Sequence, residues 1–241
     1  MNFFNEVIDI AVKYYPQLLS GVKNTLLISL TSTLAGLLIG LVAGVIRTAP
    51  KSRHLALRVL QRIINALIAI YVEIFRGTPM MVQSVVIFWG YAFMNGGQTL
   101  PLIPAGIIIV SVNTGAYMAE IVRGGIMSID RGQTMVRVIL PQVIRNILPS
   151  VSNEFVINIK DTSVLNVIGV TELYYFADVI KRQNFKQFQT YVIVCAIYFV
   201  LTFTVTRLLR LLERRLEGRN SYTVFGSQTD PDAEIHIKTE G

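Results

Sequence analysis

Charged and hydroxyl-bearing side chains interrupt two otherwise apolar stretches of the sequence. In the first, residues 63–93, Glu73, Arg76 and Thr78 come just before Pro79. Pro79 removes an amide donor and collides with the carbonyl one turn earlier, which predicts a kink or break. Glu73 and Arg76 lie one helical turn apart, so an internal ion pair is feasible. Ionisable groups at membrane depth cost at least about 2.5 kcal/mol each, and they usually form a pair or line a pathway for a polar solute.

The second interrupted stretch is residues 151–170. It contains four consecutive polar residues: Lys160, Asp161, Thr162 and Ser163. The same energetic argument makes them candidates for a solute pathway. From another stretch, Asn113 and Tyr117 could add neutral hydrogen-bonding groups. Isolated polar residues of this kind are more often contacts between helices, and that alternative stays open.

No motif for catalysis accompanies these residues. The sequence has no Gly-x-x-x-x-Gly-Lys-Ser/Thr loop that would hold the phosphates of ATP. It also lacks His-Glu-x-x-His and Gly-x-Ser-x-Gly patterns, and its two histidines, His54 and His236, lie outside the apolar stretches. We therefore predict that the chain is not an enzyme and holds no metal or cofactor of its own.

The segments that must position the polar residues are long and weakly charged. Only 15% of the residues are charged, against about 25% in a soluble domain. Five apolar blocks stand out, at residues 24–46, 63–93, 100–119, 151–170 and 188–206. Because a helix crosses the hydrocarbon core with about 20 mostly apolar residues, we predict an all-α, polytopic membrane protein with five transmembrane helices. Residues 1–219 would form the membrane domain and residues 220–241 a polar C-terminal tail.

Basic residues gather in alternate connections between the blocks. Arginine-rich runs at 47–62, 123–145 and 207–219 follow the first, third and fifth blocks, whereas the other connections are neutral or mixed. Cytoplasmic loops retain Lys and Arg, so the N-terminus is expected outside and the C-terminus in the cytoplasm. The net charge of +7 therefore indicates membrane topology, and no nucleic-acid partner is expected.

Three glycines in the first block, Gly36, Gly40 and Gly44, recur at every fourth residue and share one helix face. Small residues let membrane helices approach closely. The pattern predicts a tight seam with another helix or another subunit. The general abundance of glycine in membrane helices is the alternative explanation.

Four strings occur in order along the chain: EIFRGTP at 73–79, AYMAEIVRGGI at 116–126, ILPQVIRNILP at 139–149 and KDTS at 160–163. Over roughly residues 14–218 the sequence resembles the permease subunits of bacterial ABC importers for polar amino acids, of the histidine, glutamine, glutamate or arginine type. The resemblance implies a type I importer fold and a multi-pass location in the bacterial cytoplasmic (inner) membrane.

The same resemblance implies a set of partners and a mechanism. Two permeases, identical or closely related, would sit above two ATP-binding-cassette ATPase subunits that bind ATP and magnesium. A substrate-binding protein would dock on the outer face, and alternating access would move the amino acid through the membrane. Asp161 and Glu73 would suit an ammonium or guanidinium group, whereas Arg76 and Lys160 would suit a carboxylate. A zwitterion needs both signs, which fits any polar amino acid.

One segment departs from the family pattern. Family members carry an amphipathic Glu-Ala-Ala and Gly-containing helix that docks into the ATPase. Here the sequence runs directly from Gln133 to Thr134 without it. Either the natural protein contains the helix and this sequence omits it, which the intact flanks favour, or the protein has truly lost the helix, which should weaken its coupling to ATP hydrolysis. The residues around the junction that the resemblance assigns to ATPase docking are Asp130, Arg131, Gly132, Gln133 and Arg137.

An ion-coupled secondary amino-acid transporter is the main alternative, because broken helices with midplane charges also suit such carriers. Secondary carriers usually contain internal repeats. Five spans do not divide into two equal halves, and no repeated segment is visible in the sequence. The permease interpretation is therefore favoured.

Overall fold

In the computed structural model, residues 2–128 and 140–217 are described, with the backbone alone at residues 140, 141, 216 and 217. Within these ranges the chain is helical and contains no strand. The helices follow one another in this order: α1 Phe3–Lys13, α2 Tyr15–Thr48, α3 Leu55–Gly77, α4 Met80–Met94, α5 Leu102–Met127, α6 Leu140–Asp161, the 3-10 helix η2 Thr162–Ile168, α7 Leu173–Asn184 and α8 Gln187–Glu217.

Four of the described helices, α2, α3, α5 and α8, are long and apolar enough to cross a membrane. A fifth crossing results if residues 142–168 and α7, which meet at a bend of 55°, are counted as one broken span. The short apolar helix α4 continues the block that α3 begins. These helices confirm the predicted all-α, polytopic fold.

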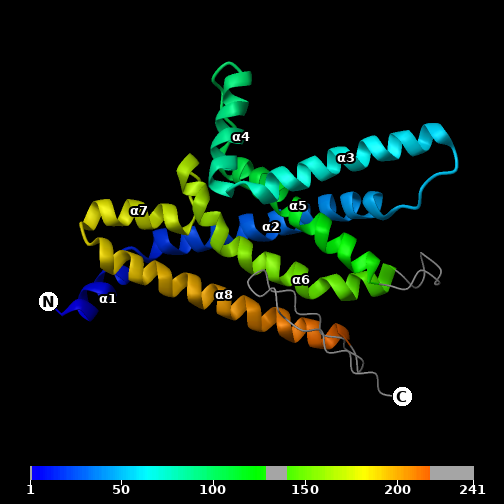
Figure 1. The fold of residues 1–241 in the computed structure, drawn as a ribbon. Helices are drawn as coiled ribbons and strands as arrows, with labels where there is room; N and C mark the ends of the chain where they lie inside the picture. Colours follow the sequence, from blue (N-terminus) through cyan, green and yellow to red (C-terminus); the bar gives the residue numbers. More distant parts are fainter. Residues whose placement is uncertain (1, 129–139, 218–241) are drawn as a thin grey trace.

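The second block breaks where proline predicted it. Helix α3 ends at Gly77, and Thr78 adopts extended backbone angles, as the residue before a proline favours. Pro79 then precedes the first residue of α4. Figure 1 shows the result, with α4 turning sharply away from the direction of α3.

Helices α2 and α5 form the centre of the molecule, and the glycine face of α2 contacts α5. A Cβ atom at Gly36 would lie 2.8 Å from the Thr114 Cβ, and one at Gly44 would lie 2.6 Å from a Val122 methyl. At Gly40 a Cβ would collide with the backbone of Met118. Only glycine therefore permits this approach of the two helices.

A buried polar cluster ties α6 to this central pair. The Asn158 side chain donates to the Thr33 hydroxyl over 2.9 Å, and its carbonyl oxygen accepts from the Thr114 hydroxyl over 3.1 Å. All three residues are buried. Buried polar groups are costly unless they are hydrogen-bonded, so this cluster fixes the register of α2, α5 and α6.

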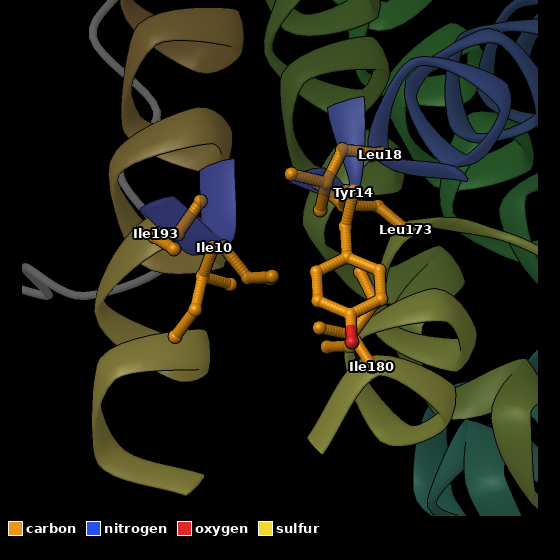
Figure 2. Packing of buried hydrophobic residues seen from close by; sticks show 8 residues of the cluster. Ile10, Tyr14, Leu18, Leu173, Ile180 and Ile193 are labelled. Atoms are coloured by element: carbon orange, nitrogen blue, oxygen red, sulfur yellow. The ribbon is translucent and has the colours of Figure 1, made fainter. Parts of the chain in front are cut away.

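An apolar cluster joins α1 and the start of α2 to α7 and α8 (Figure 2). Ile10 and Tyr14 lie at the end of α1, and they share the cluster with Leu173, Ile180 and Ile193 from the two C-terminal helices. The N-terminal segment thus docks on the same end of the bundle as α7 (Figure 1).

Candidate functional site

A pocket of about 600 Å³ lies beside the break between α3 and α4. It is lined by the last turns of α3 and by α5, through Val72, Glu73, Arg76, Gly77 and Tyr117. Glu73 and Arg76 are both exposed on the surface of this single chain. Three of the predicted pathway residues, Glu73, Arg76 and Tyr117, therefore meet in one pocket.

Glu73 and Arg76 do not form the ion pair that their spacing in the sequence made feasible. No ion pair joins Glu73 to Arg76, both of which lie in the described part of α3. The guanidinium of Arg76 instead lies over the Tyr117 ring, 5.5 Å from its centroid. Arg76 reaches across to α5, and this orientation separates it from the carboxylate one turn away on its own helix.

The Gln83 side chain bridges the break between α3 and α4. The Gln83 side-chain amide donates to the Phe75 and Thr78 carbonyls over 3.0 and 2.8 Å, which satisfies backbone oxygens at the end of α3. Its own carbonyl oxygen accepts from Asn113 over 2.8 Å. The Thr78 hydroxyl donates to the Ile74 carbonyl and also accepts from Gln83. In this chain, then, Asn113 and Thr78 make interhelical and helix-end contacts.

Helix α6 brings two acids toward the same region. Glu154 is only 5% exposed, and it is close enough to Arg76 and Asp161 for their charges to interact. Asp161 follows Glu154 two turns later, at the end of the same helix. Opposite charges from α3 and α6 are therefore arranged around an aromatic ring from α5.

The remaining predicted pathway residues have different surroundings. Lys160 lines a second pocket of about 310 Å³ between α6 and α8, away from the residues that line the first. Thr162 is buried and its hydroxyl donates to the Ile159 carbonyl over 3.1 Å, while Ser163 is half-buried. Neighbouring residues at the end of α6 and the start of η2 thus face different surroundings.

Two residues near the first pocket escaped the predicted set. Glu154 could have been noticed as an acid inside an apolar block, and Gln83 as an amide one turn after the break. Neither type of residue is diagnostic without the neighbouring helices. In the parts of the chain that the structure describes, no group of three His, Cys, Asp or Glu residues could hold a metal ion.

The predicted ATPase-docking residues, from Asp130 to Gln133 together with Arg137, lie outside the described residues, as does the junction between Gln133 and Thr134. On the described side of that gap, Glu120 pairs with Arg47 and with Arg123, the latter over 2.8 Å. This cluster joins the C-terminal end of α2 to the C-terminal part of α5, the helix that precedes the undescribed residues.

Known membrane subunits of transport systems are similar to this chain in sequence. Residues 36–218 match the family described as binding-protein-dependent transport system inner membrane component. The glutamine transport system permease protein GlnP of Escherichia coli K12 is 34% identical, over 84% of this chain and 94% of its own length. The L-cystine transport system permease protein TcyB of Bacillus subtilis 168 is 32% identical, over 85% of this chain and 88% of its own.

Solved structures agree. An amino acid ABC transporter crystallised with histidines superposes with a TM-score of 0.73 and 34% identity, covering 89% of this chain and 99% of its own. The methionine ABC transporter MetNI in an inward-facing form superposes with a TM-score of 0.68 at 19% identity, covering 85% and 98%. The second likeness concerns the fold alone.

Proposed function

The chain belongs to the family of binding-protein-dependent transport system inner membrane components, and from this premise we propose that it is the permease of an ATP-driven importer for a polar amino acid. It would lie in the cytoplasmic membrane of a bacterium, with its N-terminus outside and its C-terminus in the cytoplasm. The basic connections support this orientation, since cytoplasmic loops retain Lys and Arg.

The proposed substrate site is the pocket beside the α3–α4 break together with the acids of α6. The observation that carries it is the placement of Arg76 over Tyr117, with Glu154 close enough for charge interaction. Arg76 would bind the carboxylate of an amino acid, and Glu154 or Asp161 its ammonium group. Relatives named for glutamine and L-cystine transport support a polar substrate.

The open side of this pocket supports a second permease as a partner. Glu73 and Arg76 are exposed in the single chain, and ionisable groups are costly in contact with lipid. Helix α3 also exposes Leu67, Ile70 and Ile74. A second permease, identical or closely related, would cover this face, and alternating access would open the shared passage to each side in turn.

Energy and selectivity would come from other subunits. The sequence contains no phosphate-binding loop for ATP, so two separate ATPase subunits would bind ATP and magnesium. An extracytoplasmic binding protein would deliver the amino acid. Nothing in the family match favours the ion-coupled alternative.

Reconstitution of the full chain with its co-purifying subunits tests this proposal. We expect an ATPase to elute with the permease and its ATP hydrolysis to rise when a loaded binding protein is added. The R76Q variant should retain the ATPase but lose most of the substrate-dependent increase. The proposal would be contradicted if the complex assembled but its rate of ATP hydrolysis depended neither on the binding protein nor on Arg76.

A further inference from the structure

The groove between α6 and α8 has a composition that the transport pathway does not explain. It encloses about 310 Å³ and is lined by Val156 and Lys160 of α6 and by one face of α8. The α8 residues recur at helical spacing: Phe199, Thr202, Phe203, Thr206, Arg207 and Arg210. None of the eight described residues that line the groove is acidic.

We propose that this groove binds the phosphate-bearing headgroup and upper acyl chain of an anionic phospholipid. Arg207 and Arg210 follow directly after the uncharged run that ends at Thr206. A helix leaves the hydrocarbon core where such a run ends. The two arginines therefore lie at the level of lipid headgroups, whichever way the chain is oriented.

The cations in the groove are available to an anion. Within the described residues, neither Arg207 nor Arg210 forms an ion pair. The Arg207 guanidinium lies over the Phe203 ring, 5.0 Å from its centroid, which holds the side chain against the groove. Lys160 adds a third cation to the lining of the groove, from α6.

The two threonine hydroxyls that line the groove do not take part in binding the phosphate. The Thr202 hydroxyl donates to the Tyr198 carbonyl over 2.9 Å, and the Thr206 hydroxyl donates to the Thr202 carbonyl over 2.6 Å. Their protons are used within α8, so recognition of the phosphate falls to the cations.

The apolar part of the groove suits an acyl chain. Phe199 is 66% exposed and Phe203 is 50% exposed, and both lie toward the membrane interior from the arginines. Figure 1 shows α8 running along α6, against which it packs. Basic pockets between membrane helices at the headgroup level are a known mode of recognition for anionic lipids.

Native mass spectrometry of the full transport complex, extracted from nanodiscs of phosphatidylglycerol and phosphatidylcholine, tests the proposal. The R207Q/R210Q variant should bind phosphatidylglycerol with about a fivefold loss of affinity for each arginine. The matched control R214Q/R215Q removes two exposed arginines of α8 that do not line the groove. It should retain the lipid, and R207K/R210K should restore most of the binding.

Each other outcome overturns the proposal. Equal lipid loss in R207Q/R210Q and R214Q/R215Q would show general surface attraction. Displacement by inorganic phosphate alone at lipid-equivalent concentration would show a free-phosphate site. Loss of a second permease with unchanged lipid content would show a protein interface. If R207Q/R210Q fails to assemble, Val156→Trp, which fills the groove without changing charge, should still exclude the lipid, and full retention would refute the site.

Discussion

The Arg76 guanidinium of α3 lies over the Tyr117 ring of α5, 5.5 Å from the ring centroid. This contact joins the end of the helix that breaks at Pro79 to the central helix of the bundle. It also keeps the positive charge in the pocket without an ion pair to Glu73, which lines the same pocket. A cation held in this way can meet a substrate carboxylate without first leaving a carboxylate partner.

Removing the aromatic ring should therefore impair transport. In Tyr117→Leu the cation–π contact, about 0.5–2 kcal/mol, is lost, and we expect uptake to fall roughly twofold to thirtyfold at low substrate concentration. Tyr91→Leu, at a partly exposed tyrosine of α4 that does not line the pocket, is the matched control. Equal uptake by the two variants in proteoliposomes would remove Tyr117 from the site.

Asp161 should matter more for transport than for assembly. It lies at the surface of the chain at the end of α6, close enough to Glu154 for the two charges to interact. We expect Asp161→Ala to lower the uptake rate while the yield of intact complex in gel filtration stays near wild type. Asp9→Ala, which removes an exposed acid of α1, should change neither quantity. Wild-type uptake by Asp161→Ala would exclude a role in the pathway.

The α2–α5 seam predicts a steric effect. A Cβ at Gly40 would lie 2.6 Å from the Met118 carbonyl carbon, and backbone cannot move aside as a side chain tip can. Gly40→Ala should therefore destabilise the fold by about 1–3 kcal/mol, seen as a lower midpoint in thermal unfolding. Gly124→Ala, at a helical glycine of α5 with open space around it, is the control. If the unfolding midpoint of Gly40→Ala equalled that of the control, α2 and α5 would not approach each other as closely as the structure shows.

Docking of α1 should depend on pH through Glu6. Hydrogen bonds from Lys186 and Gln189, 2.9 and 2.8 Å long, hold the pKa of this carboxyl below its ordinary value of 4.5. The contact is present at pH values above the ordinary pKa and is lost as the pH falls through the lowered one. The protection factors of the α1 amides, which correct the hydrogen-exchange rate for the intrinsic effect of pH, should therefore fall on acidification below pH 4.5. In Glu6→Gln this pH-dependent fall should be absent, and its persistence there would assign it to another group.

The sequence predicted those features that depend on local chemistry and block length. The apolar blocks indicated the membrane helices, and Pro79 indicated the end of α3, because a missing amide donor acts wherever the helix lies. The polarity of Glu73, Arg76 and Tyr117 also indicated residues that share a pocket.

Relations between distant residues could not be predicted in this way. Arg76 turns toward Tyr117, and Asn113 pairs with Gln83, because α5 packs beside the break. Lys160 lines the groove between α6 and α8 and not the first pocket. Neighbouring residues of α6 point about 100° apart around the helix axis, so each of them meets a different neighbouring helix. Such directions depend on which helices are neighbours, and no pattern within a single helix encodes that.

Uptake of a labelled polar amino acid into proteoliposomes tests the central claim most directly. Wild-type complex, with its binding protein outside and ATP inside, should accumulate substrate even when ionophores abolish every ion gradient, and R76Q should not. Accumulation that continues without ATP and stops when the gradients collapse would contradict the assignment of this chain to an ATP-driven importer.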